Sequence, residues 1–288
     1  MTTLYIYLKN NFPGVYKQIR DVLFPIIDRL RETKRKRFTQ PVIKEVSVLG
    51  HEFKIALDPA NGFLDSHIFI TGAYELDILA VMKQHLHPGE VFIDIGGNIG
   101  WHSLFATSIV GSSGQVHTFE PLPKLQAQFT SSVEANNFTD IIKLYPFGVS
   151  NKTETQRLYL NSKNMGNSSL FINHKQESLD IELKPADEVL AQLPRVDLIK
   201  IDTEGAELAV LQGLIATLKS KRPTLIIEFS PSFWGEDKLA RGQEFMSILR
   251  NANYTIRDIE AGQNEVKDDE KWLTSFAKVQ TNLLCLPN

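Results

Sequence analysis

A glycine-rich turn after a short apolar run is the first place where this sequence could do chemistry. The run Val91–Ile95 contains Asp94, and four residues follow it closely: Gly96, Gly97, Asn98 and Gly100. Glycines let a ligand approach the backbone, and the start of a helix offers free N–H groups. The dinucleotide fingerprint G-x-G-x-x-G requires glycine at its third position, where this sequence has Asn98 or Ile99. A ligand without pyrophosphate is therefore favoured, S-adenosylmethionine being the obvious one, and the alternative is a turn that binds nothing.

An acidic residue follows one strand–helix–strand unit later. Glu120 ends the next apolar run, Gln115–Phe119, 26 residues after Asp94. A carboxylate at this position can accept hydrogen bonds from both ribose hydroxyls of an adenosine. We expect Glu120 to bind the ribose; its pairing with the glycine turn disfavours the alternative, a solvated strand end.

Charged residues lie in and directly after a third apolar run, Leu198–Ile201, where a buried parallel strand should be apolar. Because side chains alternate along a strand, Lys200 and Asp202 point to one face. A buried lysine needs a partner, and we expect Glu228 on the next strand to provide it. Two compatible interpretations follow: a structural ion pair at Lys200, and a polar cluster of Asp202 and Glu204 beside the ligand.

Strands and helices alternate along the part of the chain that positions these residues. Strands are predicted at Val91–Ile95, Gln115–Phe119, Ile141–Pro146, Leu198–Ile201 and Leu225–Phe229, and helices at Ser103–Ile109, Lys124–Asn136 and Ala206–Leu218. This alternation predicts a doubly wound parallel sheet with helices on both faces.

The flanking segments complete the expected α/β fold. Before the sheet we expect a strand pair within Val42–Leu57 and a helix from about Ala73 to Leu86. After it we expect a helix at Glu244–Ala252 and two strands, Tyr254–Ile259 and Asn282–Leu286. The polar stretch Gln263–Lys271 between these strands is expected to be a surface insertion.

Taken together, the motifs resemble the FkbM family of S-adenosylmethionine-dependent methyltransferases. The resemblance rests on Asp94–Gly100, Phe119–Pro121 and Ile199–Glu207, with further similarity at Gly72–Glu75, Gly148–Asn151 and Arg222–Pro223. It covers roughly residues 50–288, and Gly97 departs from it, since the family more often has alanine there. The resemblance implies a class I, Rossmann-like sheet, mostly parallel with an antiparallel last strand.

The resemblance also implies the reaction, which is O-methylation of a hydroxyl on a sugar, glycan, glycolipid or natural product. The implied cofactor site comprises Tyr74, Glu75, Asp94, Gly96, Gly97, Asn98, Gly100, Trp101, Glu120 and Asp202. Trp101 would either pack against the methionine half of the cofactor or belong to the hydrophobic core. Two alternatives are a nicotinamide-dependent oxidoreductase on a related sheet and a non-catalytic binding or scaffold protein.

Methyl transfer to an alcohol calls for a group that takes or orients the acceptor proton. Asp202 is the favoured base, Glu204 is expected to position the acceptor, and His102 is the fallback base. The carboxylates of Asp202, Glu204 and Glu228 are of the type that binds divalent cations. Because Lys200 would repel a cation, we predict no metal.

Charge and composition divide the chain into a basic leader and an acidic body. Its 288 residues carry a net charge of −3, whereas residues 1–44 carry +7, so the body argues against nucleic acid as a partner. An amphipathic helix is expected at residues 13–32, and residues 13–37 are a candidate for dimerisation or peripheral membrane contact. We therefore expect a helical extension over residues 1–45 and a catalytic domain over 46–288.

The expected location is the cytoplasm, because no apolar run is long enough to span a membrane, the first residues lack the apolar stretch of a signal peptide, and Cys285 is the only cysteine. If the extension is separate from the catalytic fold, a chain that starts near Val42 should still bind the cofactor. Circular dichroism and calorimetry of that truncated chain would check this, and an unfolded product would contradict the division.

Overall fold

The structure is a computed structural model that describes residues 41–59, 62–160, 168, 170, 177–276 and 278–288. The basic helix predicted at residues 13–32, and the dimer or membrane contact through residues 13–37, lie outside these residues. Within the described ranges, no helix combines the length and the apolar character needed to cross a bilayer.

The central sheet has eight strands in the order β12-β11-β13-β10-β9-β3-β4-β5. Their bounds are β3 Val91–Ile95, β4 Gln115–Phe119, β5 Ile142–Tyr145, β9 Leu198–Ile201, β10 Thr224–Phe229, β11 Tyr254–Asp258, β12 Asn264–Glu265 and β13 Thr281–Pro287. Strands β5, β4, β3, β9 and β10 pair in parallel, and β13 is antiparallel to β10. The predicted class I, Rossmann-like α/β sheet with an antiparallel last strand is therefore confirmed.

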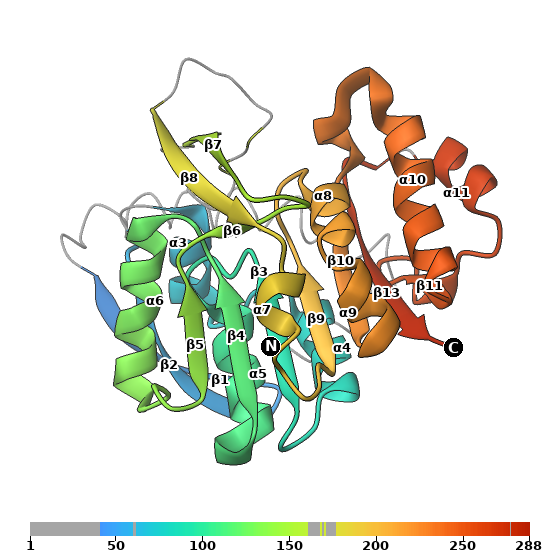
Figure 1. The fold of residues 1–288 in the computed structure, drawn as a ribbon. Helices are drawn as coiled ribbons and strands as arrows, with labels where there is room; N and C mark the ends of the chain where they lie inside the picture. Colours follow the sequence, from blue (N-terminus) through green and yellow to red (C-terminus); the bar gives the residue numbers. More distant parts are fainter. Residues whose placement is uncertain (1–40, 60–61, 161–167, 169, 171–176, 277) are drawn as a thin grey trace, which may run out of the picture.

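Helices cover both faces of this sheet (Figure 1). Alternation along β3 shows the two layers, because Phe92 belongs to one buried cluster and its neighbours Ile93 and Ile95 to another. The first cluster includes residues of α4 (Leu76–His85), α5 (Trp101–Val110) and α6 (Pro123–Asn136). The second includes residues of α7 (Asp187–Leu190), α8 (Glu207–Gln212), α9 (Ile215–Ser220) and α10 (Lys238–Asn251). The sheet is thus doubly wound, as predicted.

The predicted strand pair is present as β1 (Val42–Val48) and β2 (His51–Leu57), which pair antiparallel. Leu49 and Gly50 form the turn, and both have positive φ, 51° and 84°. Apolar side chains of β2 belong to the same buried cluster as those of α5 and α6. The β1–β2 pair therefore extends the hydrophobic core on the face of the main sheet that α5 and α6 cover.

A second, three-stranded sheet lies beyond the carboxyl ends of β4 and β5 (Figure 1). It consists of β6 (Gly148–Val149), β7 (Glu154–Tyr159) and β8 (Ser178–Lys184), in the order β6-β8-β7. This sheet was not predicted, because its strands are short or largely polar. Its position over the edge of the main sheet makes it relevant to any ligand bound there.

Two predicted helices differ from the structure in where they begin or break. The single helix expected at Ala206–Leu218 is divided into α8 and α9 at Gly213. A Cβ on Gly213 would lie 2.0 Å from the carbonyl oxygen of Ser150, so the backbones meet too closely for another residue. The helix expected from Ala73 begins only at Leu76, because Glu75 has a left-handed φ of 43°. An additional helix, α3 (Phe63–Thr71), precedes it and ends at Gly72, whose φ is 71°.

The C-terminal insertion is more ordered than expected. The stretch Gln263–Lys271 contains β12 and the first turn of α11 (Asp269–Ser275). Asp268 caps this helix by accepting a hydrogen bond from the N–H of Lys271 at 3.0 Å. The helix at Glu244–Ala252 likewise begins earlier, at Lys238, because its first turn is exposed and lacks the apolar pattern.

Candidate active site

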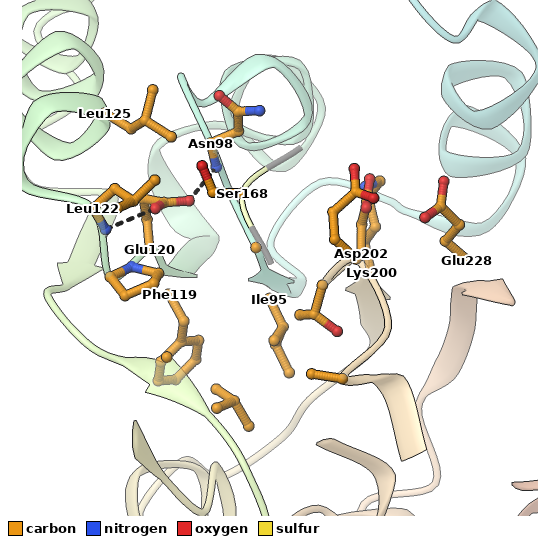
Figure 2. Close-up of a pocket in the computed structure, with 18 of the residues that line it drawn as sticks. Ile95, Asn98, Phe119, Glu120, Leu122, Leu125, Ser168, Lys200, Asp202 and Glu228 are labelled. Atoms are coloured by element: carbon orange, nitrogen blue, oxygen red, sulfur yellow. Dashed lines mark hydrogen bonds and ion pairs between the residues drawn. The ribbon is translucent and has the colours of Figure 1, made fainter. Parts of the chain in front are cut away.

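A cavity opens at the carboxyl ends of β3, β4, β9 and β10, bordered by residues of β6, β7 and β8. Figure 2 shows Glu120, Leu122 and Leu125 on one side of it and Lys200, Asp202 and Glu228 on the other. Strand order along the chain reverses at β3, which lies between β4 and β9. Ligands of open α/β sheets bind at such a reversal.

The glycine turn gains its shape from close approaches between backbones and rings. Gly96 has a φ of 86°, and a Cβ there would lie 1.8 Å from the carbonyl oxygen of Asp202. At Gly97 a Cβ would lie 2.1 Å from a methyl carbon of Thr118. Gly96 and Gly97 therefore bring the turn after β3 against its two neighbouring strands, and both line the cavity.

Glu120 connects the glycine turn to the loop after β4. It is only 5% exposed, and its two oxygens accept hydrogen bonds from the N–H groups of Asn98 (2.9 Å) and Leu122 (2.8 Å). Burial raises the pKa of Glu120 to about 7, against the opposing effect of the two N–H donors. Each oxygen keeps a lone pair for a further donor, and the residue lines the cavity.

Lys200 pairs with Asp202 and not, as predicted, with Glu228. The Lys200 Nζ lies 2.8 Å from the Asp202 Oδ2, and the lysine side chain is 3% exposed. The two residues are neighbours on one face of the strand, so the nearer carboxylate takes the ammonium. Glu228 instead accepts hydrogen bonds from Ser230 Oγ (2.8 Å) and Gln280 Nε2 (2.6 Å).

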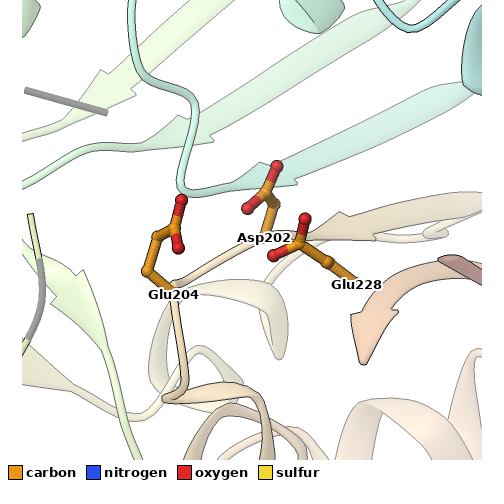
Figure 3. A group of neighbouring side chains, drawn as sticks. All are labelled: Asp202, Glu204 and Glu228. Carbon is orange, nitrogen blue, oxygen red and sulfur yellow. The ribbon is translucent and has the colours of Figure 1, made fainter. Parts of the chain in front are cut away.

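Three carboxylates converge beside this ion pair (Figure 3). Asp202, Glu204 and Glu228 each place an oxygen within 4.8 Å of the others. Burial, followed by repulsion from Asp202, raises the pKa of Glu204 to about 8 and that of Glu228 well above its usual range. Protonation relieves this repulsion without a cation, and the Lys200 ammonium contacts one of the three groups. The absence of a metal stays a prediction.

These raised pKa values predict how stability depends on pH. Glu204 has a pKa of about 8, and Glu120 and Glu207 of about 7, against 4.5 for an ordinary glutamate. Between about pH 5 and 8 the folded protein therefore holds more protons than the unfolded chain, so the free energy of unfolding should fall as the pH rises. Glu75 has a pKa of about 2, so it affects the pH dependence of the free energy of unfolding only at more acidic pH.

Thermal unfolding of the ligand-free protein from pH 5 to 8.5 checks this expectation. The melting temperature should decrease across this range, and Glu204→Gln should make the decrease above pH 7 smaller. A melting temperature that rises between pH 5 and 8 would contradict the assignment of these raised pKa values.

A carboxylate–histidine pair lies where α4 and α5 begin. The His102 Nε2 lies 3.1 Å from the Glu75 Oε2, and the two side chains are 9% and 20% exposed. His102 lines the cavity, whereas Glu75 lies behind it. Burial raises the pKa of Glu75, but the contacts with His102, Lys200 and Tyr74 outweigh it and lower the pKa to about 2.

The structure brings most of the predicted site residues to the lining of one cavity. Those that line it are Tyr74, Gly96, Gly97, Asn98, Trp101, His102, Glu120, Asp202 and Glu204. Trp101 is 2% exposed and donates its indole N–H to the carbonyl of Tyr74 at 3.0 Å, so it belongs to both the cavity wall and the core.

Three predicted cofactor residues support the wall from behind, since none of them lines the cavity. Glu75 contacts His102. Asp94 is fully buried and accepts a hydrogen bond from Ser103 Oγ at 2.6 Å. Gly100 allows α5 to approach α6, because a Cβ there would lie 2.0 Å from the Phe129 ring.

Several lining residues were missed by the motif analysis. The apolar part of the wall includes Phe63 on α3, Leu122 and Leu125 after β4, and Leu183 on β8. Gln280 contributes a side-chain amide from the residue before β13. The antiparallel direction of β13 was the available signal for Gln280, because such a strand begins at the edge where its parallel neighbours end.

The site and fold agree with a comparison against known families. Residues 94–256 match the family described as Methyltransferase FkbM domain. The match covers more than half of the chain, and the chain belongs to the FkbM methyltransferase family. The family name and the names of the relatives support methyltransferase activity.

Curated relatives carry methyltransferase names. Methyltransferase 1 of Beauveria bassiana is 27% identical over 58% of this chain and 74% of its own length. Hexuronic acid methyltransferase AglP of Haloferax volcanii is 25% identical over 51% and 59%, respectively. Among solved structures, the methyltransferase FkbM of Methylobacillus flagellatus has a TM-score of 0.45 and 16% identity, covering 72% of this chain and half of that one.

Proposed function

We propose that this protein is an S-adenosylmethionine-dependent O-methyltransferase. The observation that carries the proposal is Glu120, a buried acid in the cavity wall that accepts a hydrogen bond from Asn98 of the glycine turn. This arrangement offers a charged acceptor for ribose hydroxyls at the end of the second strand, beside a turn whose backbone is open to a ligand.

The two sides of the cavity suit the two halves of the proposed cofactor. Leu122 and Leu125 lie beside Glu120, and this apolar surface suits an adenine ring. Asp202 and Glu204, on the opposite side, offer oxygens that can accept hydrogen bonds from an ammonium group. When bound, S-adenosylmethionine would supply an electrophilic methyl group on its sulfonium. Tyr74, Trp101 and Asn98 also line the cavity.

The chain's own contribution to methyl transfer is alignment, exclusion of water and control of one proton. Holding an acceptor hydroxyl in line with a reactive carbon is worth effective molarities of about 10⁵ M or more. Residues of β6, β7 and β8 line the cavity, and we expect this wall to limit the access of water once ligands are bound. Asp202, Glu204 and His102 all line the cavity, and each could orient or accept the proton of the hydroxyl.

The proposed acceptor is a hydroxyl of a sugar, glycan, glycolipid or natural product. The hydrogen-bonding groups on the charged side, including Gln280 and Glu228, suit an acceptor that carries several hydroxyls. The name of the Haloferax relative, a hexuronic acid methyltransferase, supports a sugar-like acceptor. An oxidoreductase is not favoured, because Asn98 or Ile99 stands where the dinucleotide fingerprint G-x-G-x-x-G has its second glycine.

Calorimetry with S-adenosylmethionine and with NAD, followed by a labelled methyl-donor assay on hydroxylated glycans and lipids, tests this proposal. We expect binding of S-adenosylmethionine alone, with label transferred to an alkali-stable ether. Tight binding of NAD, or binding without transfer to any acceptor class, would favour one of the alternative functions. Glu134→Ala, on α6 and outside the cavity lining, serves as a control that should change neither result.

A further inference from the structure

We propose that His102 is the general base of the transfer and that Glu75 is its positioning residue, the two acting as a dyad. This inference rests on the proposed function and names the group that takes the acceptor proton. It also assigns Glu75 a role different from cofactor binding.

The contact between the two residues is close and buried. Nε2 of His102 and Oε2 of Glu75 lie 3.1 Å apart, and within the described ranges neither atom has another hydrogen-bond partner. Both atoms are buried, and a buried polar atom without a partner is costly. Each is therefore satisfied only by the other, which fixes the orientation of the imidazole.

The proposal assigns the other ring nitrogen, Nδ1, to the acceptor hydroxyl. Because Nε2 faces a carboxylate, it carries a proton, and Nδ1 keeps the lone pair of the neutral ring. His102 lines the cavity together with Asp202. The geometry is that of a base oriented by an acid through its far nitrogen.

The backbone at Glu75 supports a functional role. Glu75 has a φ of 43°, in the left-handed region that residues other than glycine rarely adopt. It stands at the N-cap position of α4, yet its side chain makes no capping hydrogen bond. The strained backbone thus places the carboxylate toward His102 instead of toward its own helix.

Asp202 is less suited to be the base. Its Oδ2 lies 2.8 Å from the buried Lys200 ammonium, and a cation at that distance stabilises the ionised carboxylate and weakens it as a base. Glu75 has the opposite effect on His102. Its negative charge stabilises the imidazolium that forms, so it strengthens the imidazole as a base.

Methyl transfer releases one proton from the acceptor hydroxyl, and His102 takes it. As the acceptor oxygen bonds to the methyl carbon and the carbon–sulfur bond breaks, the hydroxyl proton passes to Nδ1 of His102. The products are a methyl ether, a neutral thioether and an imidazolium held by Glu75, which later releases the proton to water.

Four single variants of the full chain and one double variant test the dyad; the single variants are Glu75→Gln, Glu75→Asp, His102→Asn and Asp202→Asn. The acidic limb of the kcat/KM profile should shift to lower pH by about one to three units in Glu75→Gln, because an opposite charge next to the ring is removed. Its kcat should fall at least tenfold with KM nearly unchanged. Glu75→Asp keeps the charge and should shift the limb less.

His102→Asn should lower kcat by about a hundredfold or more and abolish the acidic limb. The double variant Glu75→Gln, His102→Asn should be no slower than His102→Asn alone, because a positioning residue has nothing left to position. Asp202→Asn should retain the limb. The other charged or titratable groups near the pair, Tyr74, Lys200, Asp94, Glu204 and Glu228, are unchanged in the Glu75 variants, so the shift reports on Glu75.

An NMR titration of the His102 ring protons, assigned with His102→Asn, provides a readout that does not need turnover. Its midpoint should move to lower pH in Glu75→Gln. Any of three results would overturn the dyad. These are an unchanged midpoint in Glu75→Gln, an acidic limb of the kcat/KM profile that persists in His102→Asn, and a fall in kcat in the double variant that equals the product of the falls in the two single variants. If the midpoint moves but wild-type protein neither binds S-adenosylmethionine nor transfers methyl groups, the proposed function fails and the base role fails with it.

Discussion

Gly96→Ala should abolish binding of S-adenosylmethionine. The added Cβ would meet the carbonyl oxygen of Asp202 at 1.8 Å, and a backbone atom of a central strand's turn cannot move aside as a flexible side chain could. The φ of 86° adds strain of about 1–3 kcal/mol for a residue with a side chain. The turn must therefore move away from β9, which separates Asn98 from Asp202 across the cavity.

Calorimetry and urea denaturation measure the two consequences of Gly96→Ala. Gly262→Ala is the matched control, since Gly262 also has a positive φ (76°) but a Cβ there would contact nothing within 4 Å. The control should lose stability through backbone strain alone and bind normally. Equal stability of the two variants, together with normal binding by Gly96→Ala, would show that the turn does not form the site.

Glu120→Ala should weaken S-adenosylmethionine binding at least tenfold. It removes two charge-assisted hydrogen bonds to the ribose, each worth about 1.5–3 kcal/mol at most, and leaves the N–H groups of Asn98 and Leu122 without their acceptor. Glu120→Gln keeps the shape with a neutral amide and should be intermediate. An unchanged dissociation constant for Glu120→Ala would contradict the assignment.

The raised pKa of Glu120 gives this prediction a pH dependence. With a pKa of about 7 in the ligand-free protein, the carboxyl must lose its proton to become the stronger acceptor. The affinity for S-adenosylmethionine should therefore increase as the pH rises from about 6 to 8. Glu120→Gln has no proton to lose at this position, so its affinity should vary much less over the same range.

Local patterns were sufficient to predict the main sheet. Short apolar runs separated by helical segments predicted β3, β4, β9 and β10, and their ends predicted where Asp94, Glu120 and Asp202 would lie. These features depend on residues close in sequence, and the parallel arrangement follows from connections of one helix each.

Features that depend on distant contacts could not be predicted in the same way. The division of α8 from α9 follows from the approach of Gly213 to Ser150, which no local pattern reveals. From the sequence, either Asp202 or Glu228 could pair with Lys200. Only the side-chain geometry shows that the partner is Asp202. The Glu75–His102 pair joins the N-cap of α4 to the first turn of α5, and their relative position depends on how α4 packs beside α5.

The position of β13 has a consequence for synthesis of the protein on the ribosome. This strand is the last of the sheet in chain order, yet it lies between β10 and β11. Until it emerges, β10 has no neighbour on that side and β11 cannot join the sheet, so a buried apolar strand remains an open edge. Gln280, which hydrogen-bonds Glu228, arrives equally late. The nascent chain thus depends on protection of the β10 edge while almost 60 further residues are translated, a period in which aggregation competes with closure of the sheet.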